Sequence, residues 1–174
     1  MVEPQGRDGL VTAVISVLRT LNTYTVMVSQ AAADRIGINT TDLHSLNLLA
    51  FSENEMTAGE LATKTGLTTA SITGVIDRLE NVGLVRRASD PRDRRRVVVK
   101  LIPQIAGERV APVFAPLLGA WHDELSRYSD QDLNLILDFE RRVLEIMQEQ
   151  VTALRESTAR AGGNGKPGRP RTPH

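Results

Sequence analysis

The sequence predicts a mainly helical α+β chain, in which a helix-turn-helix and a two-stranded hairpin are flanked by longer helices at both ends. Three observations predict this class. Apolar residues recur at helical spacing over most of the 174 residues. A capping box and a glycine turn separate two short helices near the middle of the chain. An arginine-rich loop then precedes an alternating apolar run, which is typical of a half-buried strand.

The first predicted helix runs from Asp8 to about Ala33. Its apolar residues fall at helical spacing, and its other face is too polar for a buried helix. These apolar residues are Val11, Val14, Ile15, Leu18 and Leu21. A second helix is expected to start at a Thr40 or Thr41 cap. It should bury Leu43, Leu46, Leu49 and Ala50.

Residues 57–60 (Thr-Ala-Gly-Glu) form a capping box, in which the threonine caps the first turn and the glutamate reaches back. The short helix that follows should stop at Gly66, which can adopt a left-handed turn conformation. Thr68 or Thr69 then caps a second short helix, which Gly83 ends. The core face of this helix is Ile72, Val75, Ile76 and Leu79. Two short helices joined by a tight turn indicate a helix-turn-helix.

A hairpin is predicted between Leu84 and Ile102. Its first strand is Leu84–Ala88, and Asp90-Pro91 lies in the turn. In the second strand, Val97, Val99 and Leu101 alternate with Val98 and Lys100, so one face should be buried. The hairpin is thus a two-stranded wing beside the helix-turn-helix.

The wing carries a concentrated positive charge. Between Arg86 and Lys100, seven residues are basic and two are acidic, so the local charge is +5 in a chain whose formal total is 0. Such a charge repels itself unless an anion lies nearby, and a phosphate backbone is the natural anion. A solvated charge run is the alternative interpretation.

Two sets of residues are expected to contact double-stranded DNA. Small and hydroxyl side chains on the exposed face of the Thr68–Asn81 helix would let it enter the major groove. The alternative interpretation of this face is an ordinary solvated helix. Arg95 at the wing tip would enter the minor groove, with the Asp93 carboxylate holding its guanidinium. Of Arg86 and Arg87, one is expected to face phosphate and the other the acidic body. The predicted DNA-binding residues are Thr68, Thr69, Ser71, Thr73, Gly74, Arg86, Arg92, Asp93, Arg94 and Arg95.

Two further helical segments are expected after Pro103, and Pro112 and Pro116 should kink or break the first of them. Ser129 should cap the second. Its nearly heptad-like apolar stripe is Leu133, Ile136, Leu137, Val143, Leu144, Met147, Val151 and Leu154. A monomer this small would struggle to cover all these stripes. The expected organisation is dimerisation helices at 8–36 and 103–157, a DNA-binding domain at 40–102 and a disordered basic tail at 158–174.

Composition excludes several other functions. The chain has no cysteine, which excludes disulfides and thiolate metal sites. Its three histidines are far apart, and His122-Asp123-Glu124 is expected to be a surface segment because adjacent helical residues point in different directions. The start of the chain does not resemble a signal peptide, and no apolar run approaches the roughly 20 residues of a membrane span. We therefore expect a cytoplasmic protein with no membrane partner, cofactor, metal or catalytic site.

Four segments carry a resemblance to a known family: Glu60–Leu67, Ile72–Arg87, Asp90–Arg95 and Val97–Leu101. In this order and spacing they resemble the MarR family of winged helix-turn-helix transcriptional regulators, over roughly Leu10 to Leu154. The resemblance implies a homodimer joined through the first and last two helices and bound to a pseudo-palindromic operator. It also implies a pocket for a small lipophilic or anionic effector that releases DNA, although the lining residues are unknown.

The sequence departs from the family pattern just after the wing. Leu101-Ile102-Pro103 stands where the family has Leu-Thr followed closely by a glycine, and Pro112 and Pro116 are unusual in the next helix. We expect a dimeric transcriptional regulator, more often a repressor than an activator. Two alternatives stay open: a winged-helix protein-interaction module without its own DNA specificity, and the dimerisation domain of a small-molecule enzyme. The wing arginines argue against the first, and the lack of a catalytic segment after residue 157 argues against the second.

Overall fold

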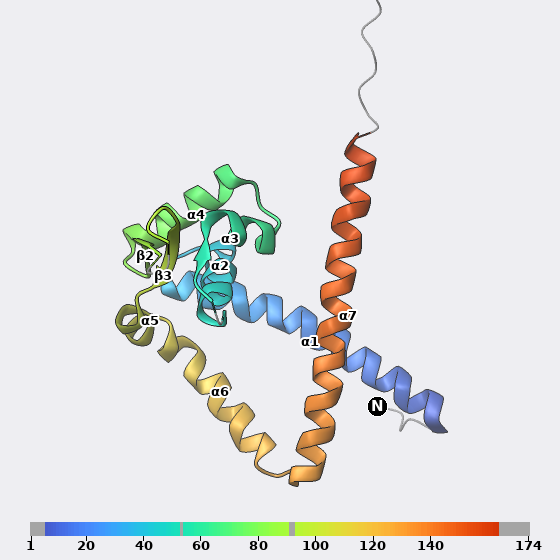
Figure 1. Ribbon diagram of the computed structural model, residues 1–174. Helices are drawn as coiled ribbons and strands as arrows, with labels where there is room; N and C mark the ends of the chain where they lie inside the picture. Colours follow the sequence, from blue (N-terminus) through green and yellow to red (C-terminus); the bar gives the residue numbers. More distant parts are fainter. Residues whose placement is uncertain (1–5, 53, 91–92, 164–174) are drawn as a thin grey trace, which may run out of the picture. The chain divides into compact units, whose positions relative to one another are not determined.

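The computed structural model describes residues 6–52, 54–90 and 93–163. The chain forms two compact units, Met1–Leu118 and Gly119–His174, and each is described by itself. The helices are α1 (Gly6–Ile36), α2 (Thr40–Ala50), α3 (Ala58–Thr65), α4 (Thr69–Asn81), α5 (Pro103–Arg109), α6 (Ala111–Leu125) and α7 (Asp130–Gly163), and the strands are β1 (Met56–Thr57), β2 (Val85–Ser89) and β3 (Val97–Leu101) (Figure 1). The predicted mainly helical α+β class is confirmed.

The core of the first unit lies among α2, α3, α4 and the sheet, and the last turn of α1 completes it. The predicted core face of α4 is confirmed, because its four apolar residues are at most 2% exposed. On α2, Leu43 and Leu46 are buried as predicted, but Leu49 is half-buried and Ala50 is exposed. The predicted threonine cap of α2 was wrong. Asn39 caps the helix instead, and its side chain accepts a hydrogen bond of 2.8 Å from the Asp42 backbone N–H.

The predicted helix-turn-helix is present. The Thr57 backbone N–H donates to the Glu60 carboxylate at 2.7 Å, and the Glu60 N–H donates back to the Thr57 hydroxyl at 3.2 Å. These two bonds are the predicted capping box of α3. Gly66 then takes the left-handed conformation that the turn requires, with φ of 73°. The turn positions the N-terminus of α4 at the surface of the unit.

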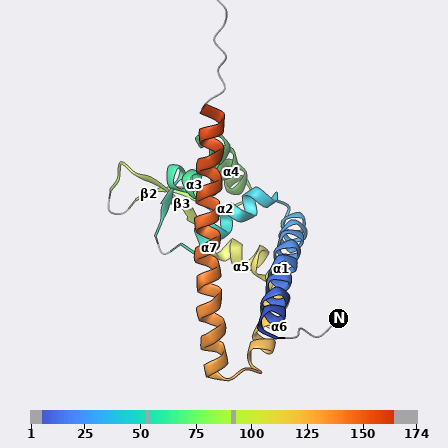
Figure 2. The ribbon, with the colours of Figure 1, turned by 90° about the vertical axis from the view of Figure 1, so that its right-hand side faces the viewer.

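The sheet has one strand more than predicted. Its order is β1-β3-β2, with both pairs antiparallel, so the two-residue β1 makes β3 the central strand. Val98 and Val99 are both buried, and each has a partner residue on β1 and on β2. Val97 pairs only with Ser89 and is 53% exposed. The predicted burial of alternate residues was therefore wrong at Val97, which is exposed, and at Val98, which is buried beside Val99. The β2–β3 wing projects beyond α3 and α4 (Figure 2).

The predicted break at Pro112 and Pro116 was misplaced: the helix is interrupted earlier, at Val110, between α5 and α6. Pro112 lies in the first turn of α6, where a missing N–H is tolerated, and Pro116 lies inside the helix, which continues past it.

In the second unit, Ser129 caps α7 as predicted, since its hydroxyl accepts from the Asp132 backbone N–H at 3.3 Å. The helix continues to Gly163. The prediction of a disordered tail from residue 158 was therefore wrong over its first six residues. Residues 164–174 lie outside the described residues.

Long helices in both units expose apolar side chains. On α1 these include Leu10, Val11, Val14, Ile15, Val17, Leu21, Tyr24, Val26 and Met27, and on α7 they include Leu135, Leu137, Phe139, Leu144, Ile146, Met147, Val151 and Leu154. Among the described residues α1 is also long and apolar enough to suit a membrane span, contrary to the expectation above. This apolar character arises because Arg19 is the single charged residue between Gly9 and Ala33. Length and composition alone are weak evidence of a span, and the last turn of α1 is part of the core.

Candidate nucleic-acid interface

The exposed face of α4 carries hydroxyl groups. Thr68 is the cap of the helix, and its side chain accepts from the Ser71 backbone N–H at 3.1 Å. The Thr68 and Ser71 hydroxyl groups lie 2.8 Å apart. Thr73 donates its hydroxyl proton to the Thr69 carbonyl at 2.8 Å, so it offers an outside partner a hydrogen-bond acceptor and a methyl group.

Thr68, Thr69, Ser71 and Thr73 are all exposed, and Gly74 beside them is half-buried. A Cβ built on Gly74 would lie 3.5 Å from Arg78 Nη1, which is ordinary van der Waals contact. The predicted residues of α4 therefore all lie outside its buried core face. Small side chains there let a helix approach the base edges of a groove closely.

Arg87 turns back from the wing onto α4. Its Nη2 lies 2.7 Å from the Asp77 carboxylate and its Nη1 contacts Glu80, while its backbone N–H donates to Glu80 at 2.6 Å. The hydrogen bond to Asp77 raises the pKa of Arg87 above its ordinary value. Arg86 is exposed. Arg87 is thus the member of the pair that faces acidic side chains, and it ties the wing to α4.

Arg96 and Lys100 also have acidic partners. The Arg96 guanidinium lies 2.5 Å from Glu60 and 3.4 Å from Asp90, and Lys100 Nζ lies 2.5 Å from Glu55. Hydrogen bonds from the Thr57 backbone and side chain, and then from Arg96, lower the pKa of Glu60 to about 2. One carboxylate therefore caps α3 and also holds the wing.

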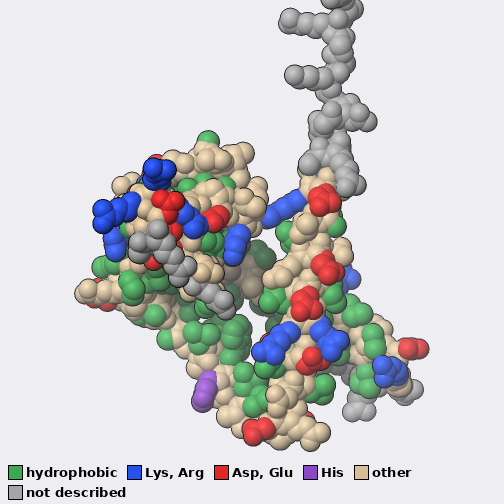
Figure 3. Space-filling model, viewed as in Figure 1, with side chains coloured by type: hydrophobic (Ala, Val, Ile, Leu, Met, Phe, Trp, Pro, Cys, Tyr) green, Lys and Arg blue, Asp and Glu red, His purple; other side chains and the backbone are tan. Residues whose placement is uncertain are grey.

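These contacts correct the reasoning from the sequence charge. Four carboxylates from neighbouring elements, those of Glu55, Glu60, Asp77 and Glu80, lie against the wing bases and offset most of the local +5. Figure 3 shows basic side chains gathered over the wing with acidic ones among them. These four partners were not predicted from the sequence, because each lies outside the arginine-rich run itself.

The wing tip is closed by Asp93. Its carboxylate accepts from the Arg95 backbone N–H at 3.0 Å, and its carbonyl accepts from the Arg96 backbone N–H at 2.9 Å. The observed contact between Asp93 and Arg95 therefore uses the backbone of Arg95, where the prediction had the guanidinium. The side chains of Arg94 and Arg95 are exposed. Arg92 lies outside the described residues.

An ion pair between α4 and a buried carboxylate of α2 was missed altogether. Arg78 donates from Nε to Asp42 at 3.0 Å and from Nη2 at 2.6 Å, and the Asp42 side chain is only 2% exposed. These bonds raise the pKa of Arg78. In the sequence, Asp42 looks like an ordinary acidic residue in the first turn of a helix, which is favourable without any partner. Arg78 could have been noticed as a charge next to the core residue Leu79.

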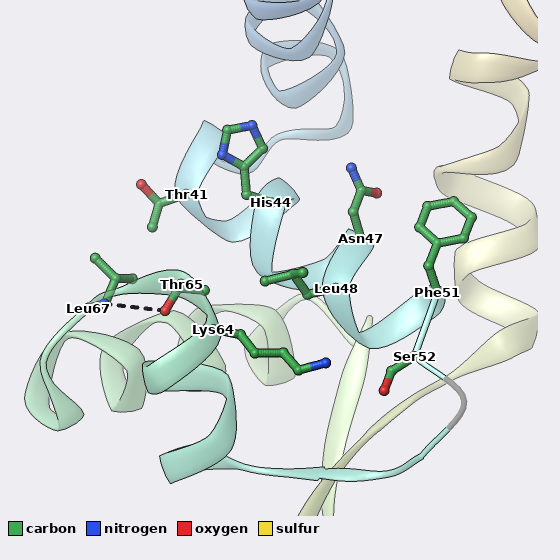
Figure 4. A pocket seen from close by; sticks show the side chains of 9 residues that line it. All are labelled: Thr41, His44, Asn47, Leu48, Phe51, Ser52, Lys64, Thr65 and Leu67. Atoms are coloured by element: carbon green, nitrogen blue, oxygen red, sulfur yellow. Dashed lines mark hydrogen bonds between the residues drawn. The ribbon is translucent and has the colours of Figure 1, made fainter. Parts of the chain in front are cut away.

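A hollow of about 540 Å³ lies between α2 and the end of α3 in the first unit. Phe51 and Leu48 form apolar parts of its wall, and the Lys64 side chain lies opposite α2 near Ser52 (Figure 4). Phe51 is 86% exposed. The complete lining is Thr41, His44, Asn47, Leu48, Phe51, Ser52, Lys64, Thr65 and Leu67. Its volume is in the range of small-molecule sites.

Three solved structures share this fold. A mutant of MepR from a multidrug resistant S. aureus clinical isolate has a TM-score of 0.62 at 16% identity, over 76% of this chain and 95% of that one. Another S. aureus MepR mutant, bound to an oligodeoxyribonucleotide, has a TM-score of 0.50 at 18% identity, over 76% and 96%. CouR from Rhodococcus jostii RHA1, bound to p-coumaroyl-CoA, has a TM-score of 0.52 at 22% identity, over 73% and 88%. At these identities the likeness shows the winged-helix fold alone.

Sequence comparison identifies the family. Residues 36–96 match the model described as MarR family. The HTH-type transcriptional regulator YcgE of Bacillus subtilis (strain 168) is 40% identical over 151 residues, which cover 86% of this chain and 96% of that relative. These matches agree with the helix-turn-helix and wing seen in the structure. The chain belongs to the MarR family of HTH-type transcriptional regulators.

Proposed function

We propose that this regulator is a homodimer that binds a pseudo-palindromic operator in double-stranded DNA and represses transcription in the cytoplasm. The observation that carries the proposal is the accessible hydroxyl face of α4 beside a wing whose Arg86, Arg94 and Arg95 side chains are exposed. A helix of this kind fits the major groove, and arginines fit phosphates or a narrow minor groove. The DNA-bound structure of MepR supports this use of the fold.

The roles of the predicted residues differ. Thr68 and Ser71 lie at the N-terminus of α4, where hydroxyl and backbone groups suit phosphate contacts. Thr73 would accept a hydrogen bond from a base amino group or contact a thymine methyl group, since its hydroxyl proton is already donated to the Thr69 carbonyl. Gly74 allows close approach. Arg86, Arg92 and Arg94 would contact phosphates, and Arg95 would enter the minor groove from a tip that Asp93 closes.

Dimerisation is supported by the exposed apolar residues of α1 and α7. Exposed apolar stripes of this extent usually mark a protein interface. A two-fold dimer would also place two α4 helices on successive major grooves, about 34–36 Å apart. The side chains of Leu18 and Leu21 on α1 and of Leu144 on α7 are the proposed centre of the interface.

We also propose that a small-molecule effector regulates DNA binding. The hollow beside α2 combines apolar walls with the imidazole of His44 and the ammonium of Lys64, so a phenolic or other lipophilic anion suits its chemistry. CouR, with its bound p-coumaroyl-CoA, shares the fold. Titration with a panel of phenolic carboxylates and their neutral methyl esters tests this. The acids should bind and release DNA, and Phe51→Ala should weaken binding more than Leu118→Ala, another exposed apolar residue.

The competing function is a protein-interaction module without DNA specificity. Selection of DNA fragments from a random pool by the purified full-length protein distinguishes the two. We expect an inverted-repeat sequence, bound with a strong salt dependence because phosphate contacts release counterions. Recovery of no common sequence, with equal affinity for every duplex tested, would favour the interaction module.

A further inference from the structure

Helices α1 and α4 end in the same way. A glycine with positive φ closes each end: Gly37, at 82°, directly follows α1, and Gly83, at 75°, follows the Val82 cap of α4. The residue after each glycine donates its backbone N–H to the carbonyl five residues earlier. These bonds run from Ile38 to Ala33 at 3.0 Å and from Leu84 to Leu79 at 2.9 Å. This closure satisfies the earlier carbonyls of the last turn and leaves the carbonyl just before the glycine pointing outward. Those two carbonyls belong to Ile36 and Val82.

One side chain binds both of these carbonyls. Arg109, the last residue of α5, donates from Nη1 to the Val82 carbonyl at 2.7 Å and from Nη2 to the Ile36 carbonyl at 3.0 Å. The C-terminus of a helix carries partial negative charge, so a guanidinium is favourable at each end. All three residues belong to the first unit, and Figure 1 shows α5 beside the C-terminal end of α1.

We propose that Arg109 is a positioning residue, which fixes the direction of α4 relative to α1 and so selects the spacing between operator half-sites. The inference rests on the proposed function. In it, α1 belongs to the dimer interface and α4 to the DNA interface. A guanidinium bonded to both helix ends connects the part that sets the distance between protomers to the part that reads DNA.

The size of the effect follows from the length of α4. Its 13 residues span about 20 Å. Arg109 holds the C-terminal end, whereas the DNA-facing Thr68 lies at the other end. A rotation of about 10° at the held end would therefore move the reading end by about 3 Å, which is close to the rise of one base pair. A small loosening at Arg109 becomes a change of register on DNA.

The two contacts need an arginine. The planar guanidinium presents Nη1 and Nη2 in a fixed geometry, so each nitrogen binds a different carbonyl. A lysine would keep the charge with a single nitrogen on a flexible stem. Arg109→Met removes both contacts and keeps the length of the aliphatic chain, and Arg109→Lys keeps only the charge.

The experiment measures spacing selectivity. Affinities are determined for the selected operator and for versions with one base pair inserted or removed between half-sites, with dimerisation and thermal unfolding measured in parallel. We expect the ratio of matched to mis-spaced affinity to fall about tenfold in Arg109→Met and by less in Arg109→Lys. Arg35→Met, which changes an exposed arginine in the last turn of α1, is the matched control and should keep the wild-type ratio.

The outcomes separate this inference from the proposed function. If both Arg109 variants remain folded dimers and keep the wild-type ratio, Arg109 does not set spacing and the inference is overturned. A uniform loss of affinity on every spacing would also overturn it, because that result describes a purely structural contact. Failure of the wild-type protein to select any DNA sequence would instead contradict the proposed function.

Discussion

The Arg78 guanidinium binds the buried Asp42 carboxylate through two nitrogens, at 2.6 and 3.0 Å, and so joins α4 to α2. The two partners differ in their access to water. Asp42 is 2% exposed and Arg78 is 50% exposed at the side chain. Losing the arginine and losing the carboxylate should therefore lower the free energy of unfolding by different amounts.

Removing the arginine should be the more damaging change. Arg78→Met leaves a buried carboxylate without its charge partner and should lower the free energy of unfolding by about 3 kcal/mol, near the bottom of the range for broken buried pairs because Arg78 is half exposed. Asp42→Asn leaves a neutral acceptor, while the arginine can turn to water, so about 1 kcal/mol is expected. Denaturant titration of both variants checks the order. A larger loss in Asp42→Asn would contradict this account.

Local features of the fold could be predicted because their signals lie within a few residues. The capping box at Thr57, the turn at Gly66 and the buried face of α4 each depend on neighbours no more than four residues away in sequence. The same is true of the Ser129 cap. The strand β1 was missed because two residues carry no periodicity, and its existence depends on pairing with β3.

The contacts that organise the candidate site could not be predicted in this way. Arg96 meets Glu60, and Arg78 meets Asp42, across 36 residues in each case, and Arg109 meets Ile36 across 73. No local pattern marks such pairs. Along the chain the wing is strongly basic, whereas folding brings carboxylates from α3 and α4 against it. The proposed contacts of Arg94 and Arg95 stay predictions.

Acid should weaken the link between Glu60 and the wing. The pKa of Glu60 is lowered from its ordinary value of 4.5 to about 2 in the folded protein, mainly by the Thr57 hydrogen bonds and then by Arg96. Because the folded pKa lies below the unfolded one, the stabilisation is complete above about pH 4.5 and is lost as the pH falls toward 2. In Glu60→Gln this part of the acid dependence should disappear.

The check is the free energy of unfolding between pH 7 and about pH 2.5, measured for wild type, Glu60→Gln and Glu108→Gln. Glu108 is exposed on α5, so its variant should follow the wild-type curve. Parallel curves for wild type and Glu60→Gln would show that the carboxylate of Glu60 does not contribute to the acid sensitivity.

Arg95→Ala should weaken operator binding by roughly 1–3 kcal/mol, the range for a specific side-chain contact. Arg95 is exposed at the wing tip, and Asp93 fixes its backbone. Binding titrations at moderate salt check this, with Arg142→Ala as the control. Arg142 pairs with Asp138 one turn away on α7 and should tolerate the change. Unchanged operator affinity in Arg95→Ala would remove the wing tip from the interface.

Leu144 on α7 is 57% exposed and lies in the apolar stripe with Leu137, Met147 and Val151. In a dimer that covers this stripe, Leu144→Glu would bury an unpaired carboxylate or prevent closure, so the dimer dissociation constant should rise at least about 100-fold. Operator affinity should fall as the dimer dissociates, because one protomer offers a single helix and a single wing.

Thr152→Glu places the same charge on the polar side of α7 and should leave both the dimer dissociation constant and the operator affinity unchanged. Sedimentation beside a DNA titration measures them, and a Leu144→Glu variant that stays dimeric with full affinity would place the interface elsewhere.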